Sequence, residues 1–353
     1  MTTQALTDAA KSAPRPSILG EHGAVTVWLY ICAFMVFAMM VIGAITRLTE
    51  SGLSMVEWRP LIGALPPLSQ EEWQRVFELY QATPEYQKKN FWMELDEFKT
   101  IFFWEWFHRL WGRTIGLVFA LPLLVFWIKG MVPQGYKRKF LFLLLLGGAQ
   151  GLMGWYMVQS GLIDQPAVSH YRLAAHLGLA FVIFGVLLWH AFTLSSFARY
   201  KTDAAFRMHL HSSALFIAIT IAWGAFVAGL DAGLLYNDSF PLMGGQIVPP
   251  DFWQHETLFG NLLENHSAVQ FAHRWLAMFS VLYIISVWAH GMAKGYKANA
   301  LNLLALMAFL QMGLGIATIF SGVNVVIAAM HQAGAAILVL LLILTIRQTS
   351  KTA

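Results

Sequence analysis

Eight apolar runs, each of about 20 residues, constrain this chain more than any other feature of its sequence. They cover residues 24–45, 110–128, 140–158, 173–197, 208–230, 275–293, 298–320 and 325–346. A helix rises about 1.5 Å per residue, so each run can cross the roughly 30 Å hydrocarbon core of a bilayer. Composition agrees, because 58% of the 353 residues are hydrophobic and 12% are charged, whereas a soluble domain is about a quarter charged. The sequence predicts an all-α polytopic membrane protein with eight transmembrane helices.

The basic residues predict how these helices are oriented. The two termini and the loops after the second, fourth and sixth runs carry thirteen lysines and arginines but three acidic residues. Short basic loops stay in the cytoplasm. We therefore expect both termini to be cytoplasmic, beginning with a polar cytoplasmic tail over residues 1–23.

Charge and cysteine content exclude several function classes. The net charge of +4 is explained by these loops, so it does not indicate nucleic-acid binding. The single cysteine, Cys32, permits neither an intramolecular disulfide nor a cysteine-ligated metal site. The first apolar run is also too long for the core of a cleavable signal peptide.

A long outer segment, residues 47–100, separates the first two runs. Ser69 and Glu72 have the spacing of a helix-capping box, and an aromatic face follows. Its members recur at helical spacing: Trp73, Val76, Phe77 and Tyr80. We predict a short amphipathic helix here that anchors the segment at the membrane surface. The alternative is that this helix lies over a pocket and covers it.

The chain repeats itself, which predicts its domain organisation. Matching residues recur at separations that shrink along the chain: Gly43 with Gly224, Glu105 with Gln270, Gln150 with Gln311, Gly154 with Gly315, and His176 with His331. Each half contains four runs, so both halves enter the membrane from the same side and their symmetry axis lies along the membrane normal. We expect two pseudo-symmetric four-helix bundles, formed by residues 24–203 and 204–353.

Four of the twelve histidines are preserved by the repeat and are candidate iron ligands: His108, His176, His273 and His331. Each lies near the outward end of an even-numbered run, so all four belong at a similar depth on the periplasmic side. A bare divalent ion takes three or four protein ligands. Two imidazoles in an apolar bundle suit the axial positions of a haem, so we predict two such sites.

Charged residues beside these histidines differ between the halves. Glu105 is one helical turn from His108, but its counterpart Gln270 cannot ionise, which favours proton-coupled chemistry on a substrate in the first half. Four arginines near the outward ends of the helices are candidates to bind haem propionates: Arg109, Arg113, Arg172 and Arg274. The alternatives are that Glu105 pairs with Arg109 or Arg113, and that the arginines reach for lipid phosphates.

Glycines lie within the third and seventh runs: Gly147, Gly148, Gly151, Gly154, Gly313 and Gly315. They permit close helix packing or passage of a flat macrocycle, and we expect packing for most of them.

Several longer motifs resemble the haem A synthase family, in particular its mitochondrial and alphaproteobacterial branch. They are residues 47–55 (RLTESGLSM), 105–113 (EWFHRLWGR), 150–161 (QGLMGWYMVQSG), 170–176 (HYRLAAH) and 271–274 (FAHR). The resemblance covers nearly the whole chain after the tail. The cysteine pair that another branch carries in its outer loops is missing here.

The resemblance implies an enzyme that oxidises the C8 methyl of haem O to a formyl group by successive hydroxylations, which yields haem A for terminal oxidases. It further implies that His273 and His331 hold a haem b cofactor, that His108 and His176 bracket the substrate haem O, and that Glu105 is the family's acidic residue. Haem O synthase and an electron-transfer protein are the implied partners, and a homo-oligomer is conceivable.

Two other functions remain open. A quinol-linked cytochrome with two b haems would place its haems at different depths, whereas the four repeated histidines share one side. His190 and His290 lie near the opposite ends of their helices, and we interpret them as packing residues rather than a third site. A transporter would need broken helices at the membrane midplane, and Pro122 is the single proline within the apolar runs.

Overall fold

A computed structural model describes residues 19–57, 62–162, 167–296 and 298–351. Within these ranges, eight helices are long and apolar enough to cross a membrane, which confirms the predicted all-α polytopic architecture. They are α2 (Gly23–Leu48), α4 (Leu95–Ile128), α5 (Lys137–Gln159), α6 (His170–Leu194), α7 (Ala204–Gly229), α9 (His266–Ala293), α10 (Asn299–Phe320) and α11 (Val325–Gln348). The expected tail lies mostly outside the described residues.

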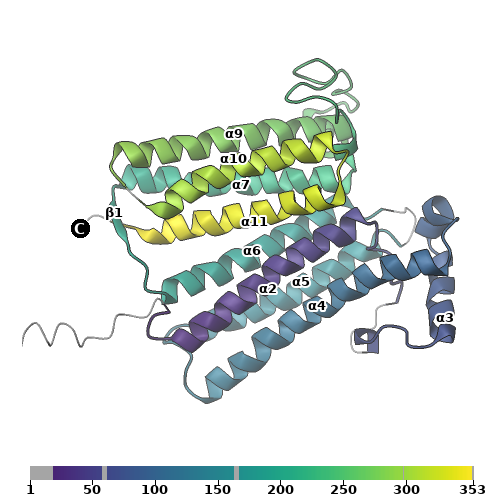
Figure 1. Ribbon diagram of the computed structural model, residues 1–353, viewed down its shortest axis with the longest axis horizontal. Coiled ribbons are helices and arrows are strands. Elements are labelled where there is room, and N and C mark those ends of the chain that lie inside the picture. The colour runs from purple at the N-terminus through teal and green to yellow at the C-terminus, as the bar shows by residue number, and fades with distance from the viewer. Residues whose placement is uncertain (1–18, 58–61, 163–166, 297, 352–353) are drawn as a thin grey trace, which may run out of the picture.

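The eight helices form two groups that lie side by side (Figure 1). In one group α2 packs on α4 and α6, and α6 also packs on α5; in the other, α9 contacts α7 and α10, and α10 contacts α11. Contacts of α6 with α7, and of α11 with α2 and α6, join the groups. Each group has its own apolar core, around Leu29 and Phe184 in the first and around Leu210 and Leu304 in the second.

Side-chain caps fix where several helices begin. Asp203 accepts a hydrogen bond from the backbone N–H of Phe206 at the start of α7. Asn265 and Asn324 cap α9 and α11 in the same way, which satisfies amides that a helix start leaves unpaired. These caps set the register of the two helices that carry His273 and His331.

The two ends of the helix bundle differ. At the end where α2 begins and α11 finishes, here called the terminal face, strand β1 (Tyr200–Thr202) pairs in parallel with β2 (Thr349–Lys351). The opposite end, here called the loop face, carries the long connections (Figure 1). These contain η1 (Ile62–Ala64), α3 (Gln70–Gln81) and η2 (Tyr86–Asn90), and in the second group η3 (Ala232–Leu234) and α8 (Leu258–Glu264).

The predicted amphipathic helix is present as α3, but its aromatic face packs against protein. Ser69 caps it by accepting from the N–H of Glu72, while the Glu72 carboxylate binds Arg75. The ring centroids of Trp73 and Phe102 are 5.1 Å apart. The preferred interpretation as a membrane anchor was therefore wrong. The reason is that α4 begins 15 residues before the apolar run and offers α3 an aromatic surface.

A buried carboxyl group between α3 and η2 makes this segment pH-sensitive. Burial raises the pKa of Glu85 to about 7, although the hydrogen bond from Tyr80 lowers it, and Glu105 and Glu50 raise it further. An unfolded chain releases this proton near pH 4.5, so the folded segment binds more protons between about pH 4.5 and pH 7. Its stability therefore falls as the pH rises through this range.

We expect Glu85→Gln to abolish this dependence and to stabilise the segment at about pH 8. Protease cleavage of residues 62–94 at about pH 5 and pH 8 measures it. Glu78→Gln, at an exposed position of α3, is the control. Retention of the wild-type pH dependence by Glu85→Gln would contradict the assignment.

Candidate functional site

Each of the four repeated histidines faces a glycine on a neighbouring helix. A Cβ built on the glycine would lie 2.9 to 3.1 Å from the imidazole Cε1 in all four cases. The pairs are His108 with Gly43, His176 with Gly154, His273 with Gly224, and His331 with Gly315. Any side chain there would displace the ring, so the glycines fix where the imidazoles lie.

The histidines form two pairs. His108 on α4 and His176 on α6 lie within electrostatic range of each other, as do His273 on α9 and His331 on α11. The structure thus brings together the residues that the repeat singled out, and each pair belongs to one helix group.

The two pairs differ in how their rings are held. In the second group, His273 Nδ1 lies 3.1 Å from the Thr220 carbonyl oxygen, and His331 Nδ1 lies 3.2 Å from Gln311 Nε2. In the first group, Nδ1 of His108 and Nδ1 of His176 are buried without a hydrogen-bond partner among the described residues. A metal-bound histidine usually bonds a carbonyl through its second nitrogen, which orients the ring. His273 has such a bond, whereas His331 Nδ1 and His176 Nε2 each lie against the amide nitrogen of a glutamine, Gln311 and Gln150. His273 is therefore the best oriented of the four.

These residues fit a haem better than a bare ion. Across the described part of the chain, no three His, Cys, Asp or Glu side chains lie close enough together to share a metal ion. Each helix group instead supplies two imidazoles within electrostatic range of each other, and Nε of Arg274, next to His273, is a buried donor lacking a partner among the residues described. A propionate carboxylate is an anion that such a donor can bind.

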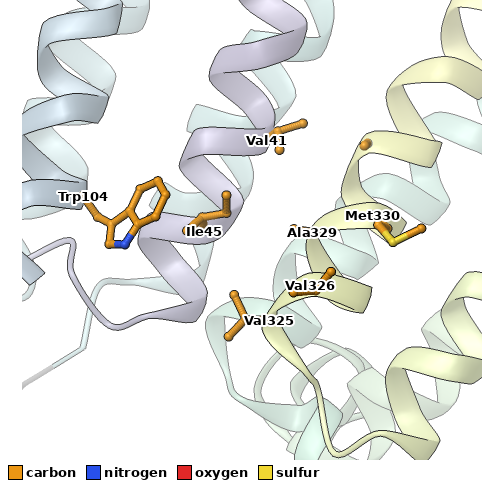
Figure 2. A pocket seen from close by; sticks show the side chains of 8 residues that line it. Val41, Ile45, Trp104, Val325, Val326, Ala329 and Met330 are labelled. Carbon is orange, nitrogen blue, oxygen red and sulfur yellow. The ribbon is translucent and has the colours of Figure 1, made fainter. Parts of the chain in front are cut away.

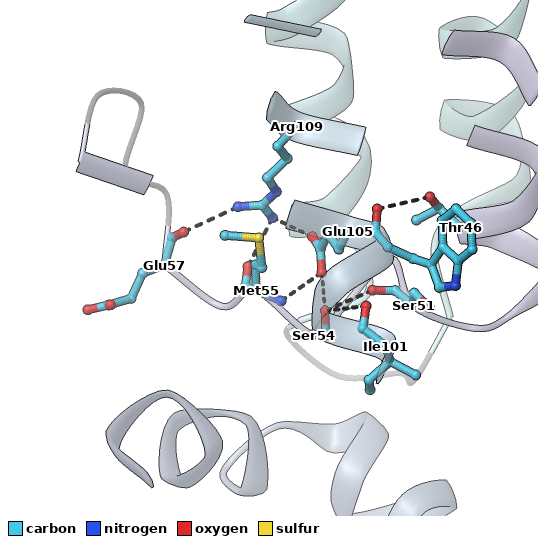
Figure 3. Close-up of polar contacts among 9 residues, drawn as sticks. Thr46, Ser51, Ser54, Met55, Glu57, Ile101, Glu105 and Arg109 are labelled. Atoms are coloured by element: carbon cyan, nitrogen blue, oxygen red, sulfur yellow. Dashed lines mark hydrogen bonds and ion pairs between the residues drawn. The ribbon is translucent and has the colours of Figure 1, made fainter. Parts of the chain in front are cut away.

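Glu105 is a hydrogen-bond acceptor that holds the outer segment against α4 (Figure 3). Its Oε2 accepts from Ser54 Oγ and from the Met55 N–H, each at 2.7 Å, and its Oε1 accepts from Arg109 at 2.5 Å. Arg109 also donates to the carbonyl oxygens of Met55 and Glu57. With 3% of its surface exposed, the carboxylate is buried and surrounded by three hydrogen-bond donors.

Gln270 holds the corresponding segment of the second group with the opposite hydrogen-bond polarity. Its Nε2 donates to the carbonyl oxygens of Ala232 and Leu235, at 2.9 and 2.7 Å, and its Oε1 accepts from Arg274. The segment near Glu105 presents donors, whereas the one near Gln270 presents acceptors. The difference between the two side chains is therefore matched by the backbone that each one meets.

The four candidate arginines are used differently. Arg109 and Arg274 bind carbonyl oxygens of the loop face, and Arg274 reaches those of Tyr236, Ser239 and Leu242. Arg172 lies over the ring of Tyr156 and donates to its carbonyl oxygen. Arg113 is partly buried one turn after Arg109. The expected pairing of Glu105 with Arg109 is present. Nε of Arg274 has no hydrogen-bond partner among the described residues, so it can donate to an anion.

Other sequence candidates have different surroundings. His190 packs against the rings of Tyr136 and Phe140, as expected of a packing residue, whereas His290 contacts His209. Packing does not explain most of the glycines, because a Cβ on Gly147, Gly148, Gly151 or Gly313 would meet nothing within 4 Å. Gly154 and Gly315 serve the histidines instead.

An apolar pocket of about 370 Å³ lies between the helix groups and contains no iron ligand (Figure 2). Its walls come from α2, α4 and α11: Val41, Ile45, Trp104, Val325, Val326, Ala329, Met330 and Ala333. None of these side chains titrates, and none belongs to a histidine pair, so the histidine pairs remain the candidate site.

Sequence reasoning missed the partners of the histidines, although the repeat contained them. Gln150 donates to the carbonyl oxygen of His176 at 3.1 Å, and Gln311 to that of His331 at 3.0 Å. Both glutamines and all four glycines recur in the two halves. Their recurrence together with the histidines was the available signal. Ser54 lies within the 47–55 motif, but no part of the repeat indicates that it contacts Glu105.

Comparisons with known proteins place the chain in a family. Residues 26–343 match the COX15-CtaA family, described as cytochrome oxidase assembly protein. The chain is 49% identical to the haem A synthase of Rhodospirillum centenum, with 98% of this chain and 93% of that protein covered. It is 46% identical to the haem A synthase of Nitrosospira multiformis, with 89% and 90% covered, and 46% identical to that of Paramagnetospirillum magneticum, with 90% and 91% covered. Matches of this extent show that the chain belongs to the COX15-CtaA family, as do the haem A synthases it resembles.

Proposed function

We propose that this protein is a haem A synthase, an oxidoreductase that converts the C8 methyl of haem O to a formyl group by successive hydroxylations. The pair of imidazoles in each helix group, each ring held against a glycine, carries this proposal together with extensive identity to haem A synthases. The conversion removes four electrons from one carbon, so it requires a bound substrate and a route for electrons. The chain has two histidine pairs, so one pair can bind the substrate while the other holds a haem that carries electrons.

We assign the cofactor and the substrate to different groups. His273 and His331, with Arg274, hold a haem b, because His273 Nδ1 lies against the Thr220 carbonyl oxygen, the kind of second bond that orients a metal-bound histidine. His108 and His176, with Arg109, Arg113 and Arg172 nearby, bracket haem O. Their rings lack Nδ1 bonds among the described residues, which suits a ligand that must leave after each reaction.

The two helix groups correspond to the two halves of the repeat, residues 24–203 and 204–353, related by an axis along the membrane normal. Matching Gly–His contacts in both groups support this symmetry. The excess of basic residues at the terminal face supports an inner-membrane protein with cytoplasmic termini and periplasmic haem sites. Haem O synthase, as the supplier of the substrate, and an electron-transfer protein are the proposed partners. A homo-oligomer of this chain is a further proposed assembly.

Glu105 is the proposed acid–base residue of the substrate site, and it also holds the segment beside that site. In Glu105→Gln the new amide N–H groups would face Ser54, Met55 or Arg109, all of which are donors. We expect haem A formation to fall by at least about 100-fold, while the haem at His273 and His331 keeps its spectrum. Haem A yield per second-group haem is the measurement.

The matched control is Gln74→Ala, on the exposed side of α3, which is expected to leave the yield unchanged. Conversion by Glu105→Gln at the wild-type rate would remove the carboxylate from the reaction.

Extraction of the haems tests the function itself. The protein is purified from its membrane, the haems are extracted with acidified organic solvent, and each is identified by chromatography and mass. Haem B together with haem O, haem A or a hydroxylated intermediate is the expected result. Two molecules of haem B per chain, reducible by quinol, would instead identify a di-haem electron-transfer cytochrome.

A further inference from the structure

Helix α5 carries three glycines on the face that it turns toward the first histidine pair. Gly147, Gly151 and Gly154 follow one another at spacings of four and three residues, which places them on one face of a helix. Gly154 fixes the direction of this face, because a Cβ there would lie 2.9 Å from Cε1 of His176. A Cβ on Gly147 or Gly151 would meet nothing within 4 Å. The glycine face, as we call these three positions, therefore borders open space beside His176.

The corresponding face in the second group is filled by side chains. The repeat that relates α5 to α10 places Ala308 at the position of Gly147 and Met312 at that of Gly151. Ala308 is fully buried, and Met312 packs against the apolar core of the second group. Both groups have a glycine against the histidine ring, but only the first group continues that glycine into an open face.

Burial along the two helices differs in the same region. The buried residues of α10 extend from Ala300 to Ala308, whereas those of α5 are Phe140 and Leu143, both close to the terminal face. Gly147, the counterpart of Ala308, is exposed. Beyond Leu143, α5 therefore packs less closely against its neighbours than α10 does, and the space beside the glycine face stays free.

The glycine face begins at the histidine pair and extends into the apolar part of the bundle. Gly147 lies seven residues before Gly154, about 10 Å along the helix axis toward the terminal face. The arginines proposed for the propionates lie toward the loop face, on the other side of the histidines. His176 itself has a buried Nδ1 that lacks a hydrogen-bond partner among the described residues. The space is thus continuous with the proposed substrate site and apolar in its surroundings.

We propose that the glycine face receives the isoprenoid chain of haem O, and that Ala308 and Met312 exclude this chain from the second group. The inference rests on the proposed function, in which His108 and His176 bind haem O. Haem O carries a farnesyl-bearing substituent where haem B has a vinyl group, so its site needs additional apolar room. Each group offers two histidines, so the iron ligands do not distinguish the two porphyrins. Side-chain volume does, because a binding site gains specificity by clashing with the wrong ligand.

Titration of the first group with two porphyrins tests the proposal. The protein is purified in lipid nanodiscs with its second-group haem in place, and haem O and haem B are added in separate titrations. Absorbance reports binding, and the measured quantity is the Kd of haem O divided by the Kd of haem B. We expect Gly151→Met, and Gly147→Ala combined with Gly151→Met, to raise this ratio at least about tenfold over the wild type. Haem B should bind these variants as it binds the wild type.

The variants and their control are matched. The second group folds with alanine and methionine at these two positions, so a four-helix bundle accommodates both side chains. Ala149→Met is the control, because it adds the same side chain to α5 at an exposed position, about 200° around the helix from Gly151. Its Kd ratio is expected to equal that of the wild type. The spectrum of the second-group haem and the unfolding temperature show whether each variant is folded.

Two results would overturn the proposal. One is a wild-type Kd ratio in the combined variant. The other is an equal loss of affinity for both porphyrins, because the glycines would then seat the macrocycle rather than the chain. If the methionine variants lost the second-group haem, Gly147→Ala alone would decide, with an expected rise of at least about threefold in the ratio. A wild-type protein that binds neither porphyrin at His108 and His176 would contradict the proposed function instead.

Discussion

Replacing His273 with alanine is expected to remove the haem of the second group and to abolish haem A formation. His273 is the imidazole whose second nitrogen meets a carbonyl oxygen, that of Thr220, so its loss leaves the iron without its best oriented ligand. His108→Ala is expected to have a different effect, because it belongs to the substrate pair. That variant should retain the second-group haem while haem A formation falls at least about 100-fold.

Difference spectra of the reduced protein, together with the haem content per chain, distinguish the two variants. His190→Ala is the control, since His190 packs against aromatic rings away from both pairs. If His108→Ala lost the resident haem and His273→Ala kept it, the assignment of cofactor and substrate would be reversed.

The second large effect is expected from single methyl groups placed against the histidines. In Gly315→Ala the new Cβ would lie 3.0 Å from Cε1 of His331, and in Gly154→Ala 2.9 Å from Cε1 of His176. These distances are below ordinary van der Waals contact, so the ring must shift from the position at which we propose that it binds iron. We expect haem affinity to fall at least about tenfold at the site concerned.

The structure offers a matched control on each helix. A Cβ on Gly313 or Gly151 would meet nothing within 4 Å, so Gly313→Ala and Gly151→Ala are expected to retain haem. Since alanine favours a helix over glycine by roughly 0.5–1 kcal/mol, they should be as stable as the wild type or more so. Haem titration of all four variants is the measurement. Equal haem retention by Gly315→Ala and Gly313→Ala would show that the Gly–His contact does not position the ligand.

The transmembrane spans and the four histidines could be predicted from the sequence alone. Transmembrane spans follow from run length, so all eight were predicted, although α4 and α9 begin well before their apolar runs. The four histidines follow from the repeat. Their partners are harder to predict, because Gly43 contacts His108 from another helix, and a glycine in a membrane helix fits several roles.

The role of Glu105 shows a second limit. From the sequence, a carboxylate one turn from His108 indicates proton chemistry or an ion pair with an arginine. In the structure it also accepts from Ser54 and Met55, which lie about 50 residues earlier in the chain. Whether a loop presents hydrogen-bond donors or acceptors depends on its backbone path. The pattern of residues along the sequence does not predict that path.

The sequence by itself determined the membrane class, the eight helices, the repeat and the four histidines, because these depend on hydrophobic run length and on recurrence along one chain. Tertiary structure decided which glycine faces each histidine, which rings are oriented through Nδ1, and where the aromatic face of α3 packs. Each of these depends on how two helices or a helix and a loop are placed against each other. Such contacts join residues far apart in the chain, so they exist only once the helices are packed.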